Sequence, residues 1–131
     1  MNGFIVDIEG LTEENENFRR VLYTGHNLQL VLMTIAPGSE IGEEIHEDRD
    51  QFFRIEQGKG EVWIDGSCTK VMADDGFIVP QGARHNVICT GDEPLRLYTI
   101  YGPPEHADGT VHKTRAEAEA SHQHFNGVTT E

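Results

Sequence analysis

Short apolar segments alternate with turn residues along most of the chain. The segments are rich in β-branched and aromatic residues, and clusters containing Gly, Pro, Asp and Asn separate them. Short strands at this density, with no long helical period between them, predict an all-β sandwich or barrel. The expected strands are 4–8, 18–24, 28–35, 51–56, 61–64, 69–72, 77–79, 85–89 and 95–101.

Two local signals refine this pattern. Asp65-Gly66 lies between two short segments and predicts a two-residue β-hairpin turn. Near the C-terminus, Thr114 and Glu117 have the spacing of a capping box, and alanines and glutamates follow them. A short polar helix is therefore expected there, packed outside the barrel or frayed, with Asn126-Gly127 as its stop.

Strand alternation assigns the polar residues of the middle segments to faces. Because side chains alternate across a strand, Gln51 shares a face with Phe53, which belongs in the core. By the same rule, Glu44 and His46 share one face, and His85 lies on the face of its apolar neighbours. The face of Gln51 is the most firmly assigned, because apolar residues flank it most clearly.

If these faces all point inward, four side chains meet inside the barrel: Glu44, His46, Gln51 and His85. A carboxylate and two imidazoles suit a divalent transition metal, and the amide oxygen of Gln51 adds a neutral fourth ligand. Two positions then remain for water, substrate or dioxygen. The alternatives are a solvated acidic run for Glu44, a polar cap of the barrel mouth for Gln51, and a backbone-bonded core histidine for His85.

The stretch around Glu44 and His46 resembles the first motif of the cupin superfamily, G-x5-H-x-H-x3,4-E-x6-G. Residues 38–58 match its spacing throughout. Glu44 stands in place of the first histidine of the motif, and Gln51 stands in place of its glutamate. The anionic ligand has therefore moved along the motif, and the charge of one carboxylate with two neutral imidazoles is kept.

The stretch around His85 resembles the second cupin motif, G-x5-P-x-G-x2-H-x3-N. Residues 74–89 contain Pro80-Gln81-Gly82-Ala83-Arg84-His85, which matches its centre, while Asp74 and Cys89 replace the first glycine and the last asparagine. The resemblance implies a jelly-roll, or double-stranded β-helix, often dimeric and with one metal inside. Metal ligands at Glu44, His46, Gln51 and His85 are implied, with divalent Fe, Mn, Ni or Zn as the ion.

Composition narrows the partners. The chain has 131 residues, enough for one domain over 1–131, and 10 Lys+Arg against 23 Asp+Glu give a net charge of −13. This charge disfavours nucleic acid and anionic membrane surfaces. The two cysteines form no disulfide framework and no signal peptide is visible, so a cytoplasmic location is expected. The expected partners are a small molecule and a second copy in a homodimer, with strand 4–8 as a pairing element.

Three functions remain open, because the superfamily includes dioxygenases, isomerases, epimerases, decarboxylases, lyases and non-catalytic sensors. The first is a metal-dependent enzyme of dioxygenase or isomerase type, in which an unligated Glu44 serves as general base. The second is a non-catalytic protein that binds or senses a small ligand. The third is a metal-free sugar epimerase or isomerase using His85 and a tyrosine as acid and base. We expect surface positions for His106, His112, His122, His124 and Arg84, and a core position for Cys89.

Overall fold

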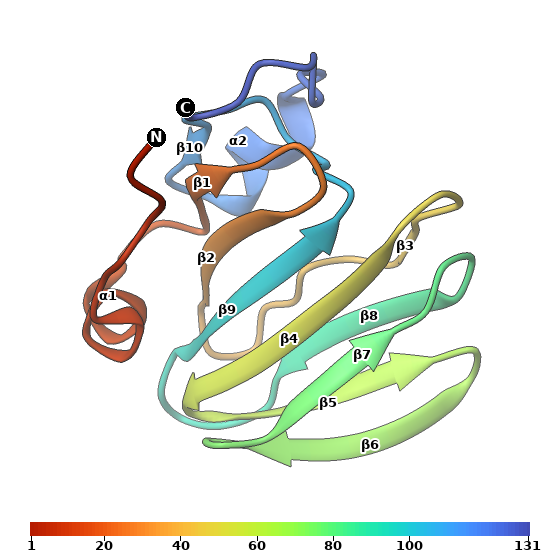
Figure 1. The fold of residues 1–131 in the computed structure, drawn as a ribbon. Coiled ribbons are helices and arrows are strands. Elements are labelled where there is room, and N and C mark those ends of the chain that lie inside the picture. The colour runs from red at the N-terminus through yellow and green to blue at the C-terminus, as the bar shows by residue number, and fades with distance from the viewer.

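A computed structural model describes all 131 residues of the chain. Two antiparallel sheets face each other and enclose one hydrophobic core (Figure 1). The larger sheet has the strand order β10-β1-β2-β9-β4-β7, and the smaller has the order β3-β8-β5-β6. The predicted jelly-roll is confirmed. The strands are β1 Arg19–Thr24, β2 Gln29–Ile35, β3 Glu44–Ile45, β4 Asp50–Gln57, β5 Lys59–Ile64, β6 Ser67–Met72, β7 Gly76–Val79, β8 Arg84–Cys89, β9 Leu95–Gly102 and β10 Val111–His112.

The core lies between the sheets because alternate positions of the long strands are apolar. Along β9, buried and half-buried residues alternate without interruption. Phe53 on β4 is 1% exposed, and its ring stacks on Phe77 of β7 with the centroids 4.8 Å apart. Val62 on β5 and Val87 on β8 close the core from the smaller sheet. Each such buried side chain contributes about 1.5–3 kcal/mol through its removal from water.

Eight of the expected strands are present with small shifts at their ends, but the expected strand 4–8 is not. Residues 4–7 lie outside any strand, and helix α1 spans Ile8–Glu14. The carboxylate of Asp7 caps this helix by accepting a hydrogen bond from the amide of Gly10 at 3.1 Å. The cap therefore ends the apolar run at Asp7, and the exposed residues 4–7 have no neighbouring strand to pair with. The homodimer, with residues 4–8 as a pairing element, stays a prediction. The two-residue strands β3 and β10 are too short to produce an alternating pattern.

Both local signals are confirmed, with one change. Asp65 and Gly66 have φ angles of 47° and 85° and join β5 to β6, as a tight hairpin requires. Helix α2 spans Arg115–Ala120, and Oγ1 of Thr114 accepts from the amide of Glu117 at 3.1 Å. The helix ends at Ala120 rather than at Asn126, so the segment after it is extended.

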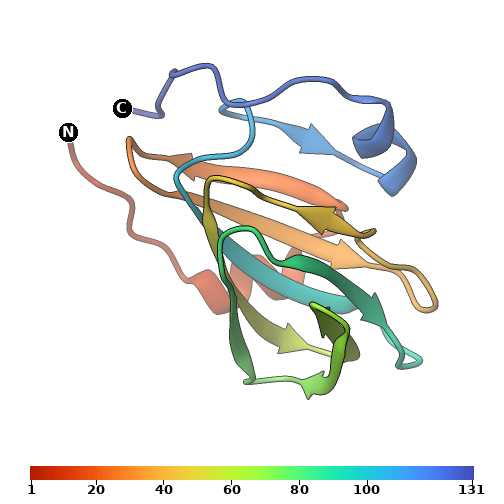
Figure 2. The same cartoon turned by 90° about the vertical axis from the view of Figure 1, so that its right-hand side faces the viewer.

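The C-terminal segment is attached along the end of the larger sheet (Figure 2). The amide of Phe125 donates to the carbonyl of Glu105 at 2.9 Å, and the amide of Thr130 donates to the carbonyl of Thr24 at 2.9 Å. At the end of the chain, the carboxylate of Glu131 accepts from the hydroxyl of Tyr23 at 3.0 Å. These contacts hold the segment over the open end of the jelly-roll. No helix has the length and apolar character needed to cross a membrane.

Candidate metal centre

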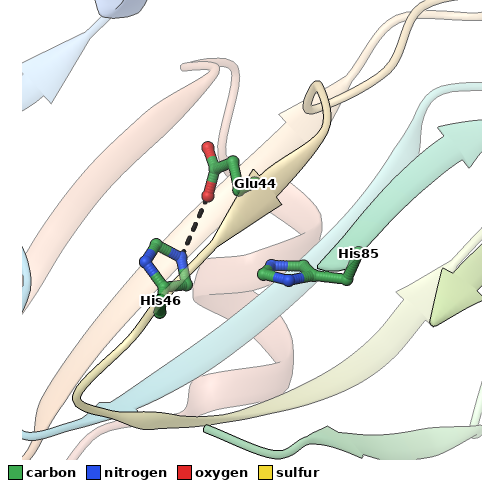
Figure 3. Close-up of side chains that lie close together, drawn as sticks. All are labelled: Glu44, His46 and His85. Atoms are coloured by element: carbon green, nitrogen blue, oxygen red, sulfur yellow. Dashed lines mark ion pairs between the residues drawn. The ribbon is translucent and has the colours of Figure 1, made fainter. Parts of the chain in front are cut away.

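Three of the four predicted ligands come together at one end of the core (Figure 3). Glu44 on β3 is directly opposite His85 on β8 in the antiparallel ladder, so their side chains project from the same face. His46 follows β3, and its carbonyl accepts from the amide of Gly82 at 2.9 Å. Gly82 belongs to the second motif and has a left-handed φ of 84°. Its hydrogen bond to His46 therefore holds the backbone of the first motif against that of the second at the site.

The donor atoms of Glu44, His46 and His85 all lie within 4.8 Å of one another. Nε2 of His46 is buried and lies 3.0 Å from Oε2 of Glu44, and it has no partner besides this carboxylate. Two ligand atoms bound about 2.1 Å from one ion at a right angle are about 3.0 Å apart. The two atoms thus have the spacing of adjacent ligands, while the whole triad is slightly wider than a closed coordination sphere.

His85 is held with one nitrogen available to a metal. It is 3% exposed, and its Nδ1 lies 3.2 Å from the carbonyl of Ala83. Because a carbonyl only accepts, Nδ1 carries the proton and Nε2 keeps its lone pair. Burial lowers the pKa of His85, and this outweighs the opposing effects of Ala83 and Glu44. The neutral imidazole is the form that binds a metal.

Glu44 is ionised despite its burial. Burial raises the pKa of the carboxyl, but its interaction with His46 and the positive charge of Arg19 bring the pKa below its usual value. A carboxylate in this position favours a cation beside it, because a buried charge is costly unless it is compensated. The half-buried position of Glu44 does not fit the alternative of a freely solvated acidic run, although its neighbours Glu43 and Glu47 are exposed, as strand alternation predicts.

A second carboxylate lies behind His46. Oε2 of Glu105 is 3.7 Å from Nδ1 of His46 and 2.8 Å from Nη1 of Arg49. The amide oxygen of Gln29 accepts from the backbone amides of Glu105 and His106 at 3.1 and 3.0 Å, which fixes this loop to β2. Glu105 therefore favours a proton on Nδ1 of His46 and leaves Nε2 facing Glu44.

Gln51 is inside the jelly-roll, as predicted, and is 3% exposed. Its Nε2 donates to Oγ1 of Thr99 at 2.9 Å, while its Oε1 is buried without a hydrogen-bond partner. It is paired with Tyr101 of β9, whose ring contacts that of His46 with the centroids 5.7 Å apart. The free oxygen is the atom that a metal would use, so the assignment of Gln51 as a ligand stays a prediction with a chemical basis.

A cavity of about 310 Å³ opens beside Glu44 and His46, and most of its lining is polar. Sequence analysis did not identify four of its residues as functional: Arg19, Glu105, His106 and His112. The signal for Arg19 was present, because it shares a face with Val21, and both are 6% exposed. The others depend on how the loop after β9 and the short strand β10 return to the site, which no local pattern encodes.

The surface assignment of the tail histidines is wrong for His106, which is 8% exposed and lies with Nε2 3.3 Å from the hydroxyl of Tyr101. Burial, with a contribution from Arg19, lowers the pKa of His106 to about 2. His112 is half-buried and lines the cavity, whereas His122 and His124 are exposed as expected, and His124 also borders the cavity. The remaining assignments hold: Cys89 is 1% exposed in the core, and the exposed Arg84 pairs with Glu43 at 2.6 Å.

The fold and this donor set define a double-stranded β-helix with a candidate metal centre of one carboxylate and two imidazoles. The family model described as "Cupin domain" matches residues 31–101. The chain belongs to the cupin family.

Relatives extend the likeness over nearly the whole chain. An uncharacterised protein of Bacillus subtilis strain 168, YrkC, is 47% identical over 124 residues, which cover 90% of this chain and 67% of the relative. The uncharacterised protein L612 of Acanthamoeba polyphaga mimivirus is 35% identical, over 90% of this chain and 76% of its own length. The crystal structure of BH2720 from Bacillus halodurans has a TM-score of 0.90 and 45% identity, and the match covers 92% and 96% of the two chains.

Proposed function

We propose that this cupin binds one divalent transition metal through Glu44, His46, Gln51 and His85 and acts on a small molecule beside it. The observation that carries the proposal is the geometry of His46 and Glu44. Their facing atoms are 3.0 Å apart, the spacing of adjacent metal ligands, and the buried Nε2 of His46 has no partner besides this carboxylate. The buried Oε1 of Gln51 has no hydrogen-bond partner at all, which is costly, and a cation at the site would satisfy it.

The roles of the residues follow from their surroundings. His46, His85 and Glu44 hold the ion, and Glu105 and the carbonyl of Ala83 fix the two imidazoles. The ion supplies Lewis-acid polarisation of a ligand oxygen or, as iron, redox chemistry with dioxygen. The cavity beside Glu44 and His46 holds the small molecule, and the segment after α2 limits its access to water. These features support an enzyme of dioxygenase or isomerase type.

Two observations make the metal-free epimerase a weaker proposal. It needs a tyrosine hydroxyl working with His85, but the only hydrogen bond of the His85 ring is to Ala83. Tyr101, the buried tyrosine of the site, faces His106 instead, and burial raises the pKa of its hydroxyl. The non-catalytic alternative keeps the same metal and cavity and differs only in turnover.

The test measures metal content and the open positions together. Tag-free protein is loaded with Fe(II) under nitrogen, passed through a desalting column, and analysed by mass spectrometry. We expect about one iron per chain, and we expect His46→Ala and His85→Ala to lose it, with the exposed His122→Ala as the matched control. Nitric oxide added to the loaded protein then gives the paramagnetic signal of an iron nitrosyl if a coordination position is open. Unchanged metal content in both site variants would overturn the proposal.

A further inference from the structure

One charged side chain at the site forms no direct ion pair. Arg19 on β1 is 6% exposed, forms no ion pair, and its Nε is buried without a hydrogen-bond partner. Its direct contacts are with neutral groups: Nη1 is 3.4 Å from Nδ1 of His112, and Cζ lies 5.4 Å from the centroid of the Phe18 ring. The carboxylate of Glu44 feels its charge without contacting it. Arginine cannot lose its proton in a protein, so its burial without an anion is costly.

The position of Arg19 is built into the sheet. It is directly opposite His112 of β10, the strand at the edge of the larger sheet, and opposite Met33 of β2. These neighbours set the guanidinium at the wall of the cavity that also contains Glu44 and His46. Strands β1 and β10 lie together at the end of the molecule, next to α2 (Figure 1). The charge is therefore fixed beside the metal site by backbone pairing.

The charges of the cavity select an anion of low charge. Glu105 is already paired with Arg49 at 2.8 Å, and Glu44 faces the imidazole of His46. A divalent ion on the triad adds positive charge to that of Arg19, so a ligand that completes the site carries negative charge. The carboxylates of Glu44 and Glu105 would repel a doubly charged phosphate, while the guanidinium fork matches the two oxygens of a carboxylate.

We infer that Arg19 binds the carboxylate of a small organic acid and that another oxygen of the same acid lies at the metal. The contact with the metal rests on the proposed function, whereas the contact with Arg19 does not. The cavity of about 310 Å³ has room for about ten water-sized groups, which fits an acid of a few carbons. Arg19 thus defines the substrate class of the site.

The experiment compares acids with their neutral amides. Lactate, glycolate and pyruvate, which are all monoanions, are titrated into the protein by calorimetry at constant ionic strength, beside lactamide, glycolamide and inorganic phosphate. Each titration is made once in chelator and once with Mn²⁺ loaded. We expect at least one acid to bind, its amide not to bind, and Arg19→Met to weaken the acid at least about thirtyfold. Arg20→Met is the matched control, because Arg20 is the exposed neighbour on the same strand.

A second measurement remains informative if binding is weak or a variant misfolds. Methionine has a similar length and no charge, so Arg19→Met removes an uncompensated buried cation. We expect this variant to melt at a higher temperature than the wild type without acid, and to gain nothing when acid is added. A variant that melts lower without acid, and still gains as much as the wild type with acid, contradicts the inference.

The outcomes separate the two proposals. If the triad binds metal but the wild type and Arg19→Met bind acid equally well, the metal site stands and the role of Arg19 is overturned. If the protein binds no metal but binds acid in chelator, and this binding depends on Arg19, the role of Arg19 is supported and the metal site is overturned. Phosphate binding as tight as the best acid, with the same dependence on Arg19, overturns the assignment to carboxylic acids, as does a complete absence of acid binding.

Discussion

The substitution Gln51→Glu tests the interior of the site most directly. Nε2 of Gln51 donates to Oγ1 of Thr99 at 2.9 Å, and this hydroxyl donates its own proton to the carbonyl of Phe52 at 2.7 Å. A carboxylate at position 51 cannot donate to Oγ1 of Thr99 as Nε2 does. The hydroxyl of Thr99 cannot donate to the carboxylate either, because its proton is used in the bond to Phe52. The new charge is therefore buried, at a position 3% exposed, with the hydroxyl of Tyr101 as the donor beside it.

The expected cost in chelator follows from these contacts. Leaving a buried polar partner unsatisfied costs about 1–3 kcal/mol, and more when the group is charged. We therefore expect the free energy of unfolding to fall by about 3 kcal/mol. For a domain of this size, each kcal/mol shifts the melting temperature by about 4 °C, so the total shift is about 12 °C downward.

Metal should reverse the effect. A carboxylate binds a divalent ion more tightly than an amide oxygen does, so the variant gains more from a fixed excess of Mn²⁺ than the wild type. A hundredfold excess over the dissociation constant adds about 2.7 kcal/mol, and each further tenfold in affinity adds about 1.4 kcal/mol.

Urea unfolding in chelator and in Mn²⁺ measures both effects. The control is Gln81→Glu, the same change in an exposed loop, which we expect to be neutral under both conditions. Two results would refute the reasoning. One is a Gln51→Glu protein as stable as the wild type in chelator. The other is equal stabilisation of the two proteins by Mn²⁺, because the position would then not face the metal.

Two further predictions concern a tight turn, at Gly58, and the buried His106. Gly58→Ala should destabilise the protein by more than about 2 kcal/mol in urea unfolding, because φ is 95° and a new Cβ would lie 2.7 Å from the carbonyl oxygen of Pro94. Gly109 has a φ of 74° and open space around the new Cβ, so Gly109→Ala should lower the free energy of unfolding only by the cost of the left-handed backbone, about 1 kcal/mol. His106 has its pKa lowered to about 2 in the fold, so the unfolded chain binds more protons below its ordinary pKa. Stability should therefore fall as pH falls below about 6.5, by up to about 1.4 kcal/mol per pH unit, and His106→Gln should flatten this slope while the exposed His26→Gln should not.

The parts of the site that could be predicted lie on strands with a clear alternation. Parity with its apolar neighbours placed Gln51 on the inward face. For His85 and for the pair Glu44 and His46, parity gave the residues that share a face, but the apolar neighbours did not decide which face points inward. The convergence of these strands came from the motif spacing. Sequence periodicity could not supply it, since β3 pairs with β8 across forty intervening residues or so, and loop closure over such distances leaves no local pattern.

The tail histidines show where local reasoning failed. Placing His122 and His124 on a helix made them diverge, but α2 ends at Ala120, and the extended segment after it returns to Glu105. His124 then lies with Nδ1 3.7 Å from Oε1 of Glu105. A capping box defines where a helix begins and says little about where it ends, so the stop assigned to Asn126 had weak support.

Arg19 marks a different limit, because the same parity rule that placed Gln51 also applied to it. An arginine that shares an inward face with Val21 contradicts the expectation that charged residues stay exposed, and such a contradiction is itself a signal of function. The next residue, Arg20, is exposed on the opposite face, so one of these two consecutive arginines is buried and the other is in solvent. The cost of the buried charge is offset when a partner from outside the chain binds to it. In this fold, that partner is most simply the anion that completes the site.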